Sequence, residues 1–313
     1  MKTLFDELCR FDGAEWRRTV EMLAGQIHDI DRNATLIWFA FYPLELHLAL
    51  EAAADLPAKK RKLGLMGRWG LADKIDSSHR FLFAHRYWPQ VKSAITATDD
   101  VTHGQLGALI TQVAEAACRT ARVDRDRLLG MAAVGLMTLR QVGIDAFRAA
   151  PGAVHLDEKI RARSAHQIQT ARAKDDWQGL LGFLRGTNKQ WTVTFDENDP
   201  AATFTAMQDQ EIASAARTDT REYRSKDPRC TPNEGPIPVE CRSASCGTCW
   251  VGVLGGAEKL SPVEAHEAAR MRVFGYTAPE VGSRPIVRLA CQARTTGAVS
   301  IVIPPWNGII SRL

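Results

Sequence analysis

Hydrophobic and polar residues follow two different periods along the chain, and the period changes near residue 186. Before that point apolar residues recur every three or four positions, which is the spacing of one buried helix face. The segments with this spacing are 15–27, 44–54, 77–95, 102–118, 124–147, 156–174 and 175–184. The pattern predicts an all-α N-terminal domain over residues 1–186, because so many amphipathic helices can pack around a core of their own.

After residue 186 short alternating runs rich in β-branched and aromatic residues predict strands. These runs are 191–195, 203–207, 250–254, 285–290 and 298–303. A short helix is expected at 212–216, a loop at 218–236 and a longer helix at 262–274. Ser261 is the expected N-cap of the longer helix, with Glu264 three residues later. The pattern predicts an α+β second domain, mostly sheet, over residues 187–313.

Composition places the chain among folded proteins. Its 313 residues are 45% hydrophobic and 24% charged, which excludes disorder as the dominant state and suits two domains. The net charge of +4 is too small to indicate a nucleic-acid partner. No uncharged apolar stretch reaches the ~18 residues of a membrane span. Asp6 and Glu7 stand where a signal peptide needs apolar residues, so a cytoplasmic location is expected.

The cysteines change this ordinary picture. The chain has seven: Cys9, Cys118, Cys230, Cys241, Cys246, Cys249 and Cys291. An odd number without an export signal argues against a disulfide framework. Five of the seven lie within residues 230–313, so metal or redox chemistry is expected there.

Three of these thiols have the spacing Cys-x4-Cys-x2-Cys at Cys241, Cys246 and Cys249, and Cys291 follows after residues 250–290. This is the plant-type spacing for a 2Fe–2S cluster, which needs four thiolates, two for each iron. Small side chains between the cysteines let the backbone approach the sulfurs. They are Ser243, Ala244, Ser245, Gly247 and Thr248.

On these residues, the stretch from about 189 to 305 resembles a 2Fe–2S ferredoxin of the plant and vertebrate type. The resemblance implies a β-grasp fold and one 2Fe–2S cluster. It also implies that Cys241, Cys246, Cys249 and Cys291 are the iron ligands. Ala244 departs from the pattern, because the family often has Gly there. The loop 218–236 is long for the family, and the predicted helix 262–274 fills a longer gap before the last cysteine.

Two other interpretations of the four cysteines remain open, a structural zinc site and free thiols. Zinc sites usually pair two Cys-x2-Cys units, and only one such unit is present. The families with a fourth cysteine soon after the third, such as molybdenum hydroxylases and succinate dehydrogenases, are disfavoured. Cys230 fits no ligand pattern and is expected to take no part.

Weaker signals each have a plainer explanation. The basic run 59–62 suits an anionic partner, but such runs are more often solvated loops. Asp76 with His79, and His47 with Glu51, offer half of a metal site or simple polar pairs. Aromatic runs at 38–42 and 81–88 suit a core better than a partner surface. No G-x-G-x-x-G motif indicates a flavin or nicotinamide module.

The sequence therefore predicts a one-electron carrier rather than an enzyme. Residues 187–313 hold 14 basic and 14 acidic residues, so their net charge cannot steer a partner. The helical domain is expected to dock the carrier onto a larger oxidoreductase, its electron donor or acceptor, or onto a second copy of the chain. A redox-sensing regulator and an enzyme with a second cofactor in the helical domain are the alternatives.

Overall fold

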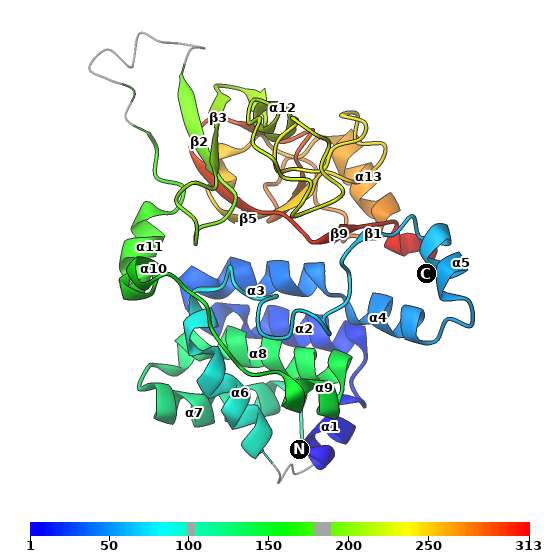
Figure 1. Ribbon diagram of the computed structural model, residues 1–313, viewed down its shortest axis with the longest axis vertical. Helices are drawn as coiled ribbons and strands as arrows, with labels where there is room; N and C mark the ends of the chain where they lie inside the picture. The colour runs from blue at the N-terminus through cyan, green and yellow to red at the C-terminus, as the bar shows by residue number, and fades with distance from the viewer. Residues whose placement is uncertain (99–103, 177, 179–188) are drawn as a thin grey trace. The chain divides into compact units, whose positions relative to one another are not determined.

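The computed structural model of the chain describes residues 1–98, 104–176, 178 and 189–313 (Figure 1). The chain divides into two compact units. The helical unit contains Met1–Glu51 and Gly70–Ala165, and the sheet unit contains Ala52–Trp69 and His166–Leu313. The predicted domain boundary at residue 186 stays a prediction, because residues 179–188 lie outside the described part of the chain.

The helical unit is built around one long apolar helix, α8 (Arg125–Val142). Every residue of α8 from Leu128 to Leu139 is buried, because α3, α6 and α7 pack against it. The other helices of the unit are α1 (Lys2–Leu8), α2 (Gly13–Leu23), α3 (Asp29–Phe41), α4 (Leu44–Glu51), α6 (Trp88–Ala97), α7 (Leu106–Ala121), α9 (Ile144–Ala149) and α10 (Glu158–Ala162), with 3-10 turns at Ala24–Gln26 and Phe83–Tyr87. The prediction that the N-terminal region is helical is confirmed.

Several predicted helices are shorter or divided. The predicted helix 124–147 is interrupted at Gly143, whose φ of +80° ends α8 before α9 begins. The helix expected from residue 77 starts only at Trp88 as α6, after the 3-10 turn Phe83–Tyr87. The buried carboxylate of Asp31 accepts the N–H groups of Phe83 and Ala84 at the start of this turn, at 2.6 and 2.8 Å. The segment 156–174 forms two short helices, α10 and α11 (Ala165–Ala171).

Other differences concern helices that the sequence pattern did not indicate, or placed elsewhere. α1 and α3 were not predicted. The helix expected at 102–118 runs from Leu106 to Ala121, and residues 102–103 lie outside the described part. Most of the helix expected at 175–184 also lies outside it.

The sheet unit contains a five-stranded mixed sheet in the order β3-β2-β8-β5-β6. Its strands are β2 (Gln190–Thr194), β3 (Thr203–Met207), β5 (Trp250–Gly255), β6 (Val287–Leu289) and β8 (Val299–Val302). β2 and β8 are parallel and the other neighbours are antiparallel. All five predicted strands are present, so the mixed α+β character of this region is confirmed.

Smaller elements complete the sheet unit. They are α5 (Leu56–Lys62), α12 (Ile212–Ala216), α13 (Ala265–Phe274), 3-10 turns at Ala257–Lys259 and Ile310–Arg312, and the strand pairs β1 (Met66–Gly67) with β9 (Trp306–Asn307) and β4 (Gln210–Glu211) with β7 (Arg294–Thr295). β1 corrects the expectation that no strand precedes residue 186. Two residues are too few for an alternating pattern to reveal them.

The predicted start of α13 was also wrong. The helix begins at Ala265 with Glu264 as its N-cap residue, rather than directly after Ser261. Ser261 makes other bonds, since its Oγ accepts the N–H of Arg294 at 3.1 Å and its carbonyl accepts Arg288 at 2.7 Å. The side chain is therefore occupied at β7, and no capping box forms.

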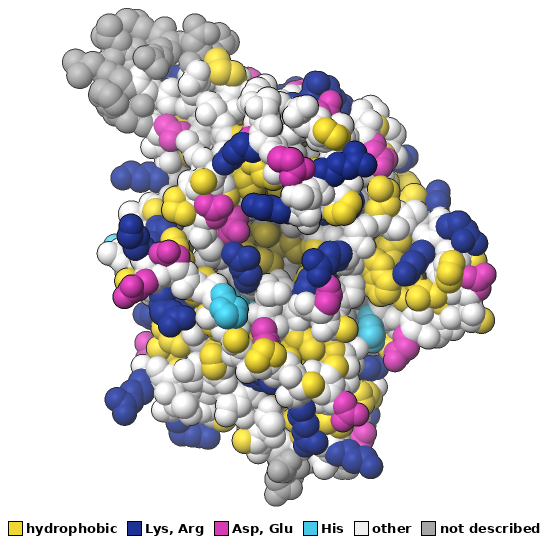
Figure 2. All heavy atoms as spheres, in the orientation of Figure 1, with side chains coloured by type: hydrophobic (Ala, Val, Ile, Leu, Met, Phe, Trp, Pro, Cys, Tyr) yellow, Lys and Arg dark blue, Asp and Glu magenta, His cyan; other side chains and the backbone are white. Residues whose placement is uncertain are grey.

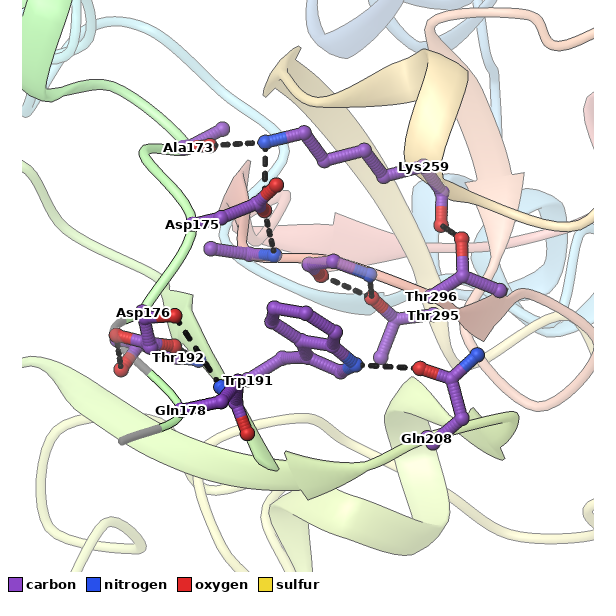
Figure 3. Close-up of polar contacts among 12 residues, drawn as sticks. Ala173, Asp175, Asp176, Gln178, Trp191, Thr192, Gln208, Lys259, Thr295 and Thr296 are labelled. Carbon is purple, nitrogen blue, oxygen red and sulfur yellow. Dashed lines mark hydrogen bonds and ion pairs between the residues drawn. The ribbon is translucent and has the colours of Figure 1, made fainter. Parts of the chain in front are cut away.

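Residues 175–176 are held to the sheet by hydrogen bonds and an ion pair (Figure 3). Asp175 accepts the N–H of Ala298 at 3.0 Å and pairs with Lys259 at 2.8 Å. Asp176 bonds Thr192 of β2 through both carboxylate oxygens. The chain thus begins its contact with the sheet before β2 starts.

In the part of the chain that the structure describes, none of the helices has the length and apolar character that crossing a membrane requires.

Candidate metal centre

The four cysteines of the predicted ligand set lie next to the start of β5 and the end of β6. The cysteine loop, residues 241–249, runs directly into β5, and Cys291 follows β6 after one residue. β5 and β6 pair antiparallel with Trp250 opposite Leu289. The N–H of Ala290 donates to the carbonyl of Cys249 at 2.9 Å, so this pairing brings Cys249 and Cys291 together although they are far apart in the sequence.

The four thiols form two pairs. Cys246 lies near enough to Cys241, and Cys249 to Cys291, for each pair of thiols to influence one another's pKa. Among the described residues, no group of three or more His, Cys, Asp or Glu side chains is placed to hold a metal ion. Two pairs of thiols supply the four thiolates, two for each iron, that a 2Fe–2S cluster requires.

Hydrogen-bond donors surround the sulfurs. Cys241 Sγ accepts the backbone N–H of Ser243 at 3.5 Å and that of Cys246 at 3.4 Å. The Thr248 hydroxyl lies 3.1 Å from Cys246 Sγ, while its oxygen accepts the N–H of Glu240. Gln292 Nε2 donates to Cys291 Sγ at 3.4 Å. Such donors favour the thiolate form that a metal requires.

The electrostatics differ within each pair. Burial by itself would raise the pKa of Cys241, but hydrogen bonds from Ser245, Cys246 and the loop backbone lower this pKa to about 6. The hydrogen bond from Cys249, helped by Gln292 and the N–H of Ala244, lowers the pKa of Cys291 to about 7. One thiol in each pair is therefore prepared to ionise near neutral pH.

The pKa values of the two partner thiols, Cys246 and Cys249, are raised instead. Burial raises the pKa of Cys246, and its bond to Cys241 adds to this shift. The bond to Cys291, followed by burial, raises the pKa of Cys249 well above its usual value. A metal binds the thiolate form, so a bound metal ion would displace the protons that Cys246 and Cys249 keep.

The two pairs differ in exposure. Cys249 and Cys291 are buried, whereas Cys241 and Cys246 are partly exposed. Arg242, Ser243 and Ser245 of the same loop are exposed. The Cys241–Cys246 pair therefore lies on the solvent side of the site.

The backbone of the cysteine loop is unusual. Arg242, Ala244 and Gly247 all have positive φ, of 65°, 57° and 73°. Ala244 is the residue that departs from the glycine often found in the resembling family, and its methyl group is buried. At Gly247 a Cβ would lie 2.7–2.8 Å from the ring of Phe274, so glycine lets the loop approach α13.

Helix α13 holds the loop through side chains that the sequence analysis did not identify. His266 Nε2 lies 3.1 Å from the carbonyl of Ser243, and since a carbonyl only accepts, Nε2 carries the proton. Arg270 donates to the carbonyls of Ala244 at 3.1 Å and Ser245 at 2.6 Å. Nothing in the spacing of these residues indicates such contacts before the helix is placed.

A buried ion pair fixes the same helix to β6. Arg288 and Glu267, exposed by only 0% and 2%, form two hydrogen bonds of 2.9 Å. Glu267 also accepts the N–H of Leu289 at 2.9 Å. An arginine inside the apolar run of β6 was the sequence signal for this pair. Through α13, the loop and the strand that leads to Cys291 are held together.

Cys230, which fits no ligand pattern in the sequence, has a hydrogen bond of its own. It is buried and its thiol donates to the carbonyl of Pro236 at 3.4 Å. Burial raises its pKa to about 11, so it stays a thiol.

The weaker sequence candidates in the helical unit form polar pairs. Asp76 accepts Trp88 Nε1 at 2.7 Å and the N–H of Gly152 at 2.8 Å. His79 is fully buried, and its Nδ1 lies 2.9 Å from that of His85. His47 pairs with Glu51 at 3.6 Å.

The aromatic runs and the basic run also have plain roles. Buried rings of both aromatic runs lie in the core, among them Trp38, Phe41 and Trp88. The basic run lies on α5, where Lys60 covers the ring of Trp69. On the face shown in Figure 2, basic side chains are interspersed with acidic and apolar ones.

Residues 230–296 match the family model described as 2Fe-2S iron-sulfur cluster binding domain. This match confirms the resemblance that the cysteine spacing indicated, and it contains all four paired thiols. It does not extend to the helical unit. Comparisons with curated proteins and with solved structures gave no match.

Proposed function

We propose that the protein is a one-electron carrier that holds a single 2Fe–2S cluster on Cys241, Cys246, Cys249 and Cys291. The observation that carries the proposal is that the β5–β6 pairing brings Cys291 to the cysteine loop within the matched region. When bound, a 2Fe–2S cluster accepts and gives up one electron. The strand order β3-β2-β8-β5-β6, with its one parallel pair, also suits the β-grasp fold that the resemblance implies.

The chain's own residues have three tasks in this proposal. Cys241 and Cys246 would hold one iron, and Cys249 and Cys291 the other. N–H and hydroxyl donors of the loop would direct partial positive charge at the sulfurs. Buried Cys249 and Cys291 keep water from one side, while the partly exposed pair lies where an electron leaves or enters.

The ligand assignment is tested by iron and sulfide analysis of the full chain and of cysteine variants. We expect two irons and two sulfides per chain, and loss of the cluster's visible absorption in Cys246→Ser and Cys291→Ser. Cys230→Ser is the matched control and should keep both. Zinc in protein made with ample iron, or equal loss from Cys230→Ser, would contradict the assignment.

The proposal includes docking through the helical unit onto a larger oxidoreductase, in a cytoplasmic setting that keeps thiols reduced. Support comes from the separate core of the helical unit around α8. Cross-linking of the full chain to its co-purified redox partner tests it. We expect the linked positions within residues 1–51 and 70–165, and links confined to 189–313 would exclude docking through this unit.

A further inference from the structure

The contact between Arg270 and the cysteine loop has a particular geometry. The guanidinium donates through Nε to the carbonyl of Ala244 at 3.1 Å and through Nη2 to that of Ser245 at 2.6 Å. Arg270 is half-buried, and its guanidinium lies 5.2 Å from the ring centre of Phe274, one turn further along α13. The side chain is therefore held by the helix while it clamps two successive carbonyls.

The clamped carbonyl of Ser245 shares its peptide group with the N–H of Cys246. That N–H donates to Cys241 Sγ at 3.4 Å. A trans peptide is planar, with its C=O and N–H pointing in opposite directions. A cation that bonds the oxygen withdraws electron density across the group, so the N–H becomes a stronger donor to the sulfur.

We propose that Arg270 is a positioning residue which acts through the Ser245–Cys246 peptide on Cys241 Sγ and raises the reduction potential of the cluster. This inference rests on the proposed function. Reduction adds one negative charge at the site, so a stronger hydrogen bond to sulfur stabilises the reduced form more than the oxidised form. Cys241 and Cys246 are also more exposed to solvent than Cys249 and Cys291.

A direct charge effect is the competing explanation, because any nearby cation favours the reduced form. Arg272 provides the comparison, since it carries the same charge on the same helix and is exposed. Lysine at position 270 keeps the charge but loses the planar fork that reaches two carbonyls. The peptide route and the direct charge effect therefore predict different results for Arg270→Lys.

The test measures the midpoint potential of the full-length, cluster-loaded protein at low and high ionic strength. Arg270→Gln should lower the potential at least twice as much as Arg272→Gln, and high salt should abolish only the Arg272 effect. Arg270→Lys should recover only part of the loss. Equal shifts for the two glutamine variants, or an Arg270→Lys potential equal to that of the unaltered protein, would overturn the inference.

Iron and sulfide analysis accompanies every measurement. Fewer than two irons in the unaltered protein would refute the proposed function, whereas two irons with no specific Arg270 effect would refute this inference alone. If Arg270→Gln loses its cluster, the midpoint potential of Arg270→Lys is compared with that of the unaltered protein instead. The electron paramagnetic resonance spectrum of the reduced state gives a second readout. It should change in Arg270→Lys and stay unchanged in Arg272→Gln.

Discussion

Single residues of the cysteine loop must meet conformational and steric requirements that cannot be inferred from the cysteine spacing. The loop has three residues with positive φ, and only Gly247 among them is glycine. Ala244 accepts the left-handed conformation with its methyl group buried. Gly247 cannot be replaced so easily, because its missing Cβ makes room for Phe274.

We expect Gly247→Ala to destabilise the sheet unit by about 2–5 kcal/mol. About 1–2 kcal/mol comes from left-handed backbone and about 1–3 kcal/mol from overpacking against the Phe274 ring. Urea unfolding of the full chain measures this loss. Gly282→Ala is the control, since Gly282 has φ +88° with open space around it. Equal losses for both variants would show that the ring contact carries no cost.

The buried ion pair should behave as a unit. Arg288→Met leaves the Glu267 carboxylate buried with the N–H of Leu289 as its remaining described donor, and should cost about 3–5 kcal/mol. We expect the double variant with Glu267→Leu to be more stable than the sum of the single changes by at least about 1 kcal/mol. A double-mutant cycle by urea unfolding measures this coupling, and strict additivity would contradict it.

Among the elements, α13 has the largest influence on the site. The sequence predicted a helix here, but indicated no role for it beyond occupying the long stretch between Cys249 and Cys291. In the structure its successive turns hold the loop through His266 and Arg270, and β6 through Glu267. His266 and Arg270 share one helix face because they are four residues apart, whereas the buried Glu267 points to β6.

The turn that precedes α6 makes the helical unit sensitive to acid. Burial, with a further contribution from Arg80, lowers the pKa of His85 to about 4, and burial followed by His85 holds the pKa of His79 well below its usual value. The folded state therefore binds fewer protons than the unfolded state, whose histidines titrate near pH 6.5. Stability is complete above about pH 6.5 and falls as the pH drops toward 4.

For His85 alone the loss should approach about 3 kcal/mol once the pH is below about 4. Urea unfolding of the full chain at a series of pH values measures the slope. His85→Leu should flatten it, whereas His166→Gln, at an exposed position of the sheet unit, should leave it unchanged. An unaltered slope in His85→Leu would exclude the pair as its source.

For the whole molecule, the division into two units is not the division of the sequence by hydrophobic period. Residues 52–69 belong to the sheet unit through the β1–β9 pair, and residues 166–176 through their bonds to the sheet. Arg172 forms two bonds of 2.8 Å with Glu197, both largely buried, and Glu197 also accepts Ser300 of β8.

Arg172→Ala should therefore destabilise the sheet unit by about 3 kcal/mol, because it leaves a buried carboxylate without its charge partner. Arg217→Ala removes an exposed arginine 3.4 Å from Glu234 and should cost less than about 1 kcal/mol. Urea unfolding compares the two. A loss for Arg172→Ala as small as that for Arg217→Ala would show that residues 166–176 do not stabilise the sheet.

The sequence by itself determined what depends on local spacing. The helical character of the N-terminal region, the five strands of the sheet and the iron–sulfur resemblance all follow from periods or spacings within short windows. It did not determine the short strand β1, the break of the long helix at Gly143, or the start of α13, where Ser261 bonds β7 instead of capping.

Tertiary structure alone decided how distant residues meet. The pairing of β5 with β6 places Cys291 beside Cys249. Helix α13 brings Arg270 to the carbonyl of Ser245, whose peptide group also carries the N–H that bonds Cys241. Neither contact leaves a local pattern, because each joins segments whose separation along the chain carries no preferred spacing. The sequence alone shows which cysteines are present and how they are spaced. The hydrogen-bond donors to their sulfurs, and the side chains that hold the loop, are visible only in the tertiary structure.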